Sequence, residues 1–298
     1  MTAVLETSRL GKRFGRRWAL SDCTLSIPEG KVVGLVGPNG AGKTTLLHLA
    51  VGLLAPSSGG IEVLGGRPAD GPAELGRVGF VAQDTPTYAG LTVAEHLRMG
   101  AYLNPGWDDQ VARHRIGQIG FDPGQRAGSL SGGQRAQLAL TLAIAKRPEL
   151  LLLDEPVASL DPLARREFLQ TLMEVVAEQG VSIVLSSHLV ADLERICDYL
   201  VVLVASHVQL AGEISELLAS HRRLTGPRRD PATMPANQEI VEASHTERQT
   251  TLLVRTDDPI LDPAWTVKPV TLEDLVLAYM SQARDAQPAR RAALEVMR

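Results

Sequence analysis

The sequence predicts an α/β protein built on a mainly parallel β-sheet with helices on both faces. Short, mostly apolar runs alternate with segments of helical pattern, which is typical of strands buried on both sides. A glycine-rich turn follows the first of these runs and leads into a helix. Hydrophobic residues make up 44% of the chain, enough for a full core. The runs are Val32–Val36, Val78–Ala82, Leu150–Leu153, Val181–Leu185 and Leu200–Val204.

Two further strands are expected ahead of the first run, over residues 4–10 and 19–27. A basic stretch over residues 12–17 joins them. A helix is expected from about residue 42 to 53, because Pro56 and a Ser/Gly cluster follow it.

Helical patterns replace strands between Gln83 and Leu130, which indicates a helical insert over about residues 84–130. Thr92 and Glu95 have the spacing of a capping box, so a helix is expected to begin there. The α/β pattern then resumes and ends near Ser220, which gives a first domain over residues 1–220.

The rest of the chain is expected to form a linker, a small module and a tail. Residues 221–237 are rich in Arg and Pro, a linker composition. The C-terminal α/β module is expected over residues 238–283, with an amphipathic helix from about residue 271. Residues 284–298 are expected to be a tail, either a short surface helix or disordered.

Bulk properties exclude several classes of protein. A net charge of −4 and a pI near 6.0 argue against a general nucleic-acid binder, so no nucleic-acid partner is expected. Cys23 and Cys197 lack metal-ligand spacing and are expected to be reduced thiols in the cytosol. No signal peptide is expected, and no apolar run approaches about 18 residues. If the protein serves transport, the pore therefore lies on another chain.

A phosphate-binding loop is predicted over residues 37–45, which read GPNGAGKTT between a strand and a helix. Its glycines permit a tight turn whose backbone N–H groups point inward, and the helix adds its positive N-terminal end. Lys43 supplies a positive charge toward the β- and γ-phosphates, and the Thr44 hydroxyl can bind Mg²⁺.

Two adjacent carboxylates, Asp154 and Glu155, end the apolar strand at residues 150–153. Neighbouring residues on a strand point to opposite sides, so the two are expected to have different tasks. Asp154 suits the Mg²⁺ shell, and Glu155 suits a base that accepts a proton from water. A helix N-cap or a solvated sheet edge remains the alternative.

A second helix start follows the sequence LSGGQ at residues 130–134. Ser131 is a natural N-cap, and the glycines after it allow another molecule to approach the backbone. The residues alone do not explain why the chain has two such helix starts, and a simple capped turn remains open.

Together these motifs resemble the ATP-binding cassette (ABC) ATPases, over residues 1 to about 218. LSGGQ is similar to the family's signature, and Gln83 to its Q-loop glutamine. Asp161, after Ser159 and Leu160, resembles the D-loop, although an Asp before Pro162 could simply begin a helix. His188 resembles the switch histidine. Phe14 stands where the family usually has a Tyr that stacks on adenine; Trp18 is a weaker candidate.

The resemblance implies a P-loop NTPase cassette with a RecA-like parallel core, an antiparallel β-subdomain and a helical insert. It also implies ATP and Mg²⁺ as ligands and a head-to-tail homodimer that encloses two ATP molecules. The implied catalytic residues are Lys43, Gln83, Glu155 and His188, and the implied metal ligands are Thr44, Gln83 and Asp154. The implied nucleotide contacts are Phe14, Gly37, Pro38, Asn39, Gly40, Ala41, Gly42, Lys43, Thr44, Thr45, Ser131, Gly132, Gly133, Gln134 and Asp161.

The resemblance further implies a separate membrane permease, docked mainly on residues 85–97, and a cytoplasmic location on the inner face of the membrane. Residues 270–280, VTLEDLVLAYM, resemble the C-terminal helix of ABC-2-type exporter ATPases, which favours export over import. Three alternatives to a transporter subunit stay open. They are a soluble ABC ATPase of translation or DNA maintenance, an iron–sulfur assembly ATPase, and a regulatory module that does not hydrolyse ATP. The single cassette, the lack of a long coiled coil and the presence of Glu155 and His188 count against most of them.

Overall fold

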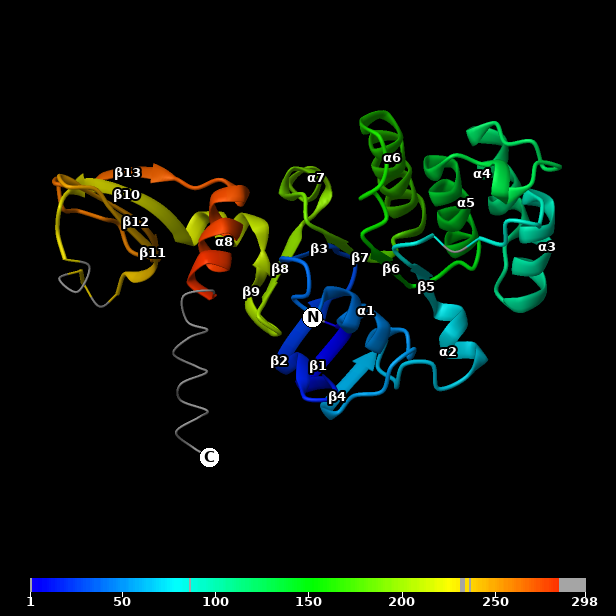
Figure 1. The fold of residues 1–298 in the computed structure, drawn as a ribbon, viewed down its shortest axis with the longest axis horizontal. Helices are drawn as coiled ribbons and strands as arrows, with labels where there is room; N and C mark the ends of the chain where they lie inside the picture. Colours follow the sequence, from blue (N-terminus) through cyan, green and yellow to red (C-terminus); the bar gives the residue numbers. More distant parts are fainter. Residues whose placement is uncertain (1, 86, 231–233, 236, 284–298) are drawn as a thin grey trace.

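The computed structural model describes residues 2–85, 87–230, 234–235 and 237–283. The tail expected over residues 284–298 lies outside this part of the chain. The helical insert and the C-terminal module lie at opposite ends of an elongated molecule, with the main sheet between them (Figure 1).

The main sheet has six strands in the order β5-β6-β7-β3-β8-β9, and all pairs are parallel except β8 with β9. Its five parallel strands coincide with the five apolar runs. The sixth, β9, has an alternating pattern and was not predicted. The strands are β3 (Val32–Val36), β5 (Val78–Val81), β6 (Leu150–Asp154), β7 (Ser182–Ser187), β8 (Tyr199–Val204) and β9 (His207–Glu213).

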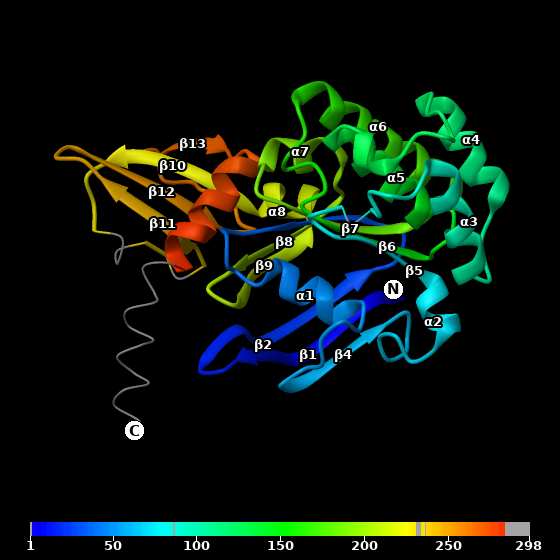
Figure 2. The same cartoon turned by 45° about the vertical axis from the view of Figure 1, so that its right-hand side comes forward.

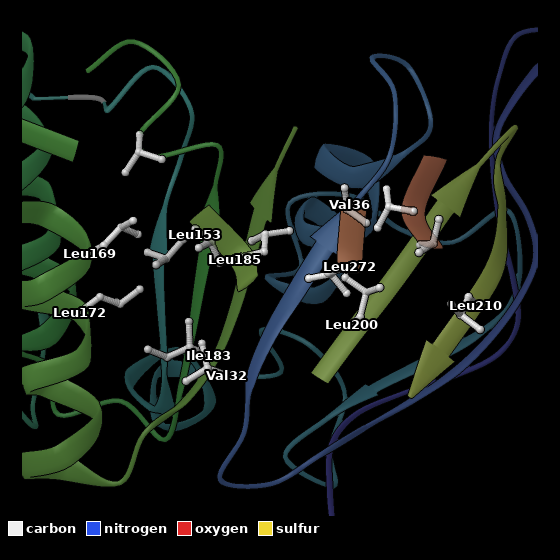
Figure 3. Close-up of a cluster of buried hydrophobic side chains, with 14 of the residues drawn as sticks. Val32, Val36, Leu153, Leu169, Leu172, Ile183, Leu185, Leu200, Leu210 and Leu272 are labelled. Atoms are coloured by element: carbon white, nitrogen blue, oxygen red, sulfur yellow. The ribbon is translucent and has the colours of Figure 1, made fainter. Parts of the chain in front are cut away.

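Both faces of this sheet are buried, as the apolar runs predicted. Successive residues of one strand belong to different clusters: Leu151 and Leu153 face α6 (Pro162–Gln179), whereas Leu150 and Leu152 face α1 (Lys43–Ala50). Figure 3 shows the first cluster, where Leu169 and Leu172 of α6 lie against Leu153 and Leu185. The five parallel strands are held in place by this burial on both faces, and their carboxyl ends therefore lie along one edge of the sheet.

A second, antiparallel sheet in the order β2-β1-β4 lies on the α1 side (Figure 2). β1 (Ala3–Phe14) and β2 (Arg17–Pro28) continue through the basic stretch, so that stretch forms a tight hairpin rather than a loop. β4 (Ser58–Val63) was not predicted, because its Ser and Gly residues are typical of turns. Gly59 is required there: its φ is +67°, and a Cβ would lie 2.2 Å from the Arg9 carbonyl oxygen.

The insert consists of α3 (Val93–Leu103), α4 (Asp109–Ile119) and α5 (Gly132–Ile144), which surround a small core of their own. The predicted capping box at Thr92 and Glu95 is present. Short helices complete the cassette: α2 (Pro72–Arg77), α7 (Val190–Ile196), α8 (Ile214–Ser220) and the 3₁₀ turn η1 (Ala127–Ser129).

Arg115 of α4 is 6% exposed, and within the described residues its Nε–H has no hydrogen-bond partner. Burial lowers the pKa of this guanidinium, which Glu174 and Glu178 of α6 oppose. An unsatisfied buried donor costs about 1–3 kcal/mol. We therefore expect Arg115→Met, which keeps an unbranched apolar stem and removes the guanidinium, to raise the free energy of unfolding by about that amount in urea titrations.

Arg113→Met is the matched control, because Arg113 lies on the same helix but is exposed and paired with Asp109. It should change stability by no more than about 0.5 kcal/mol. A less stable Arg115→Met protein would show that the guanidinium is satisfied in solution.

The C-terminal module is a four-stranded antiparallel sheet in the order β11-β12-β10-β13, with a helix over residues 272–283. Its strands are β10 (His221–Pro227), β11 (Glu239–His245), β12 (Gln249–Arg255) and β13 (Thr266–Pro269). Residues 221–227, expected to be linker, instead form the strand between β12 and β13. Their Arg-rich composition hid the strand, because only His221 and Leu224 are fully buried.

The helix over residues 272–283 lies between this sheet and the cassette (Figures 1 and 2). Leu272, Leu275 and Val276 are fully buried in the same cluster as Val36 and Leu200 of the main sheet. The module is therefore packed against the cassette rather than tethered to it.

Candidate active site

The loop predicted to bind phosphate connects β3 to α1, as expected. Its backbone is closely packed: a Cβ on Gly37 would lie 2.0 Å from the Leu203 carbonyl oxygen. Gly42 has a φ of +112°, and a Cβ there would lie 2.4 Å from the Ala19 carbonyl oxygen. Gly40 has a φ of +78°, so all three glycines of the loop are needed for the path of the chain. The turn leaves the N-terminus of α1, with Lys43 and Thr44, facing a cavity.

This cavity has a volume of about 950 Å³ and joins eleven of the predicted residues from five separate parts of the chain. They are Phe14, Asn39, Gly40, Ala41, Gly42, Lys43, Thr44, Thr45, Gln83, Glu155 and His188. Three more residues line it that sequence reasoning missed: Arg17, Ala19 and Ala158. Arg17 stood in the basic stretch, but nothing in the sequence separated it from the other cations there.

Lys43, Glu155 and His188 form a connected charged group in the cavity. Lys43 Nζ lies 2.8 Å from the Gly37 carbonyl oxygen and 3.1 Å from Glu155 Oε1. The other carboxylate oxygen, Glu155 Oε2, lies 3.1 Å from His188 Nδ1. Lys43 and Glu155 are almost buried, at 5% and 11% side-chain exposure, so water screens their attraction weakly.

Asp154 and Glu155 point to different sides, as their positions at the end of β6 predicted. Asp154 is buried and its Oδ1 accepts a hydrogen bond from Ser186 Oγ at 2.8 Å. Ser186 Oγ in turn accepts from the Glu155 N–H at 2.8 Å. Glu155 has a φ of +44°, a left-handed conformation that is costly for a residue with a Cβ. The Ser186 contact helps to hold this backbone so that the Glu155 carboxylate faces the cavity.

The expected Mg²⁺ ligands offer oxygen donors, which is the chemistry that this hard cation prefers. The Thr44 hydroxyl and the Gln83 carboxamide both line the cavity. Asp154 is 1% exposed and does not line it. Thr44 and Gln83 would therefore hold a magnesium ion that enters with a nucleotide, and the ion would offset part of the phosphate charge.

The LSGGQ segment lines a different cavity. Ser131 caps α5 in a capping box with Gln134, and the segment borders a space of about 500 Å³ between α4, α5 and α6. None of Ser131, Gly132, Gly133 or Gln134 lines the cavity that contains Lys43. Asp161 accepts hydrogen bonds from the N–H groups of Leu163 and Ala164, so it does begin helix α6. Within one chain the two groups of expected nucleotide contacts are therefore separate.

Phe14 lies at the rim of the Lys43 cavity with half of its surface exposed, and Lys12 Nζ lies 5.3 Å from the ring centroid. Trp18 is also exposed, but it packs with Arg13 and does not line the cavity. This geometry favours Phe14 over Trp18 as the side chain that would stack on the adenine ring of a nucleotide.

Phe14→Ala should weaken ATP binding by about 5- to 100-fold, because stacking of a base on an aromatic ring contributes about 1–3 kcal/mol. Titration calorimetry with Mg-ATP measures the change. Trp18→Ala is the control and should bind ATP as the unaltered protein does. The reverse order of effects would assign the stacking to Trp18.

The comparisons with known proteins agree with this site. A family model described as "ABC transporter" matches residues 20–158. The Nod factor export ATP-binding protein I of Cupriavidus pinatubonensis (strain JMP 134 / LMG 1197) is 33% identical over 228 residues, 74% of this chain and 69% of that protein. The chain belongs to the ABC transporter family.

Other relatives of this ABC ATPase include an importer subunit. The thiamine import ATP-binding protein ThiQ of Escherichia coli O157:H7 is 35% identical over 203 residues, 66% of this chain and 87% of that protein. A solved structure titled as the ATP binding subunit of an ABC transporter superposes with a TM-score of 0.65 at 30% identity, covering 72% of this chain and 91% of that one.

Membership of the family confirms the expected cassette fold and the expected activity. This chain is an ATP-binding subunit of an ABC transporter, and it hydrolyses ATP to drive transport. In the described part of the chain no helix is both long and apolar enough to cross a membrane. The roles expected for the individual site residues stay predictions.

Proposed function

We propose that this ABC ATPase works as a head-to-tail dimer that encloses two ATP molecules and energises a separate exporter permease. One observation carries the dimer: the Lys43 cavity and the LSGGQ segment do not share a cavity within one chain. Each is nevertheless a helix N-terminus suited to phosphate, at α1 and α5. A nucleotide that touches both must therefore lie between two copies.

In this arrangement ATP brings the two copies together. Lys43 leaves its ion pair with Glu155 and binds the triphosphate, and Ser131 and Gly133 of the second copy donate to the γ-phosphate. Two electropositive helix ends would otherwise have little reason to approach each other, so the nucleotide itself stabilises the interface.

Hydrolysis removes that link. Once Lys43 has turned to the phosphates, the Glu155 carboxylate is free to accept a proton from a water beside the γ-phosphate. His188, 3.1 Å from Glu155, keeps the carboxylate oriented and lies within the same cavity as the phosphates. A bound magnesium ion would neutralise part of the phosphate charge next to Thr44 and Gln83. Loss of the γ-phosphate then leaves Ser131 without its partner, and the dimer opens.

The permease is proposed to dock in an apolar groove between the core and the helical insert. The groove has a volume of about 560 Å³ and is lined on the insert side by Met99, Leu103 and Trp107, and on the core side by Leu53 and Phe80. Leu53 and Leu103 are each 64% exposed, an unusual exposure for leucine side chains that face each other across a groove. The proposed contact lies slightly beyond the expected segment of residues 85–97.

Export is supported by the relative whose name includes export and by the exporter-like sequence of residues 270–280. The proposal expects a membrane protein to be encoded beside this chain, and the test uses that protein as the permease. We expect the two to co-purify, the pair to hydrolyse ATP faster than the subunit alone, and proteoliposomes to move substrate away from the side that holds the ATPase.

Leu103→Asp should abolish co-purification, because it places a charge in the groove. Tyr102→Asp is the matched control: Tyr102 is 90% exposed on the same helix and does not line the groove. Substrate movement toward the ATPase side would contradict export, and equal effects of the two variants would contradict the docking site.

A further inference from the structure

His96 of α3 is held by two hydrogen bonds that fix its state. The side chain is 1% exposed, its Nδ1 lies 2.8 Å from the Thr92 carbonyl oxygen, and its Nε2 lies 3.0 Å from the Tyr88 backbone nitrogen. A carbonyl only accepts and a backbone N–H only donates. The partners therefore assign the donating N–H to Nδ1 and the accepting lone pair to Nε2.

The Tyr88 N–H belongs to the connection between the nucleotide cavity and the insert. Gln83, which lines that cavity, comes five positions before Tyr88 in the sequence. The same connection pairs with residues 125–128, which lead directly to Ser131. The Gly128 N–H donates to Ala89 at 3.0 Å.

Two more backbone hydrogen bonds join these segments. The Ala127 N–H donates to Leu91 at 2.9 Å, and the Val93 N–H donates to Gln125 at 2.9 Å. The approach is close, since a Cβ on Gly128 would lie 2.9 Å from the Ala89 carbonyl oxygen. A shift of residues 88–91 must therefore also move residues 125–128, which lead to Ser131.

His96 also lines the apolar groove on its other side, together with Met99, Gly100 and Leu103. One side chain thus contacts the groove and also accepts a hydrogen bond from Tyr88. Tyr88 lies in the segment that follows Gln83 and pairs with residues 125–128. A buried ring that makes two hydrogen bonds of fixed direction is held in one position. A neighbour that displaces the His96 ring would therefore also displace its partners, Thr92 and Tyr88.

We propose that His96 is a positioning residue that fixes residues 88–91 through the Tyr88 N–H and so sets the position of Ser131 for the second copy's nucleotide. A permease bound in the groove would contact the same His96 ring, so permease binding would change the position of Ser131 at the ATP interface. This part rests on the proposed function, whereas the hydrogen bond does not.

Two conservative variants separate the two bonds of His96. In His96→Gln the carboxamide oxygen can replace Nε2 and accept from Tyr88. In His96→Asn the shorter side chain can replace Nδ1 toward Thr92 but cannot reach Tyr88. Both are made in the full chain carrying Glu155→Gln, so that ATP is not consumed.

The first measurement is hydrogen exchange of the Tyr88 amide and of residues 125–128, without nucleotide. We expect the Asn variant to exchange about fivefold faster at Tyr88, the factor for one neutral hydrogen bond, and the Gln variant to match the parent. The second measurement is the dissociation constant of the ATP-bound dimer by sedimentation. It should rise about fivefold in the Asn variant and stay unchanged in the Gln variant, with ATP affinity of the monomer equal in all three.

Several results would overturn the assignment. If the Tyr88 amide exchanged equally fast in the Asn variant and the parent, the His96 hydrogen bond would not protect it. Equal dimer constants despite faster exchange would show that the bond does not position Ser131. A parallel loss of thermal stability and of monomer ATP affinity would make His96 merely structural. Failure of the parent Glu155→Gln protein itself to dimerise would overturn the proposed function, and the positioning role with it.

Discussion

Replacing Glu155 by Gln is expected to slow ATP hydrolysis by about 10²–10⁴-fold, the usual contribution of a general base. Glutamine keeps the size of the side chain but cannot accept a proton from water. The change also removes the ion pair with Lys43, whose Nζ lies 3.1 Å from Glu155, so Lys43 is freed for the phosphates. ATP binding should therefore persist, and the ATP-bound dimer should accumulate. Phosphate release measures the rate, and size-exclusion chromatography with light scattering measures the dimer.

Glu149→Gln is the matched control for this substitution. Glu149 immediately precedes β6, at the end away from Glu155, and pairs with Arg77 on the surface. Its replacement should leave hydrolysis and association unchanged. A Glu155→Gln protein that stays monomeric at saturating Mg-ATP would count against ATP as the link between copies.

Lys43→Ala should weaken ATP binding by about 100-fold or more, and hydrolysis should fall with it. A charge-assisted hydrogen bond contributes about 1.5–3 kcal/mol, and the proposed function has Lys43 bind more than one phosphate. The substitution also leaves Glu155 almost buried without its cation, so an uncompensated negative charge would face the incoming triphosphate. Calorimetry with Mg-ATP tests this.

Lys31→Ala serves as the comparison, because Lys31 is a partly exposed lysine paired with Glu213 outside the cavity. It should bind ATP normally. If Lys43→Ala kept an affinity within about threefold of the unaltered protein, the cavity would not be the triphosphate site.

The sequence predicted the parts of the fold that are set by local pattern. Strands buried on both faces appear as mostly apolar runs, and the phosphate loop is defined by glycines whose Cβ atoms would collide with backbone, as at Gly37 and Gly42. The different directions of the Asp154 and Glu155 side chains follow from strand alternation, whereas their separate roles stay a prediction.

Other features depend on packing between distant segments and were not readable. β4 and β10 have turn-like or linker-like compositions, and become strands because β1 and β12 supply hydrogen-bond partners. Arg17 joins the nucleotide cavity only through the hairpin geometry. The role of His96 required the position of Tyr88, eight residues earlier in the chain.

The most direct test of the shared nucleotide site mixes two inactive proteins, Lys43→Ala and Ser131→Arg. Each alone has both sites of its dimer damaged and should be inactive. In a mixed dimer one site combines both defects, and the other joins an intact phosphate loop to an intact LSGGQ segment. An equimolar mixture should recover about a quarter of the unaltered rate, because about half of the dimers are mixed and each has one working site. A mixture no more active than the two proteins measured separately would contradict a nucleotide site built from two copies of this chain.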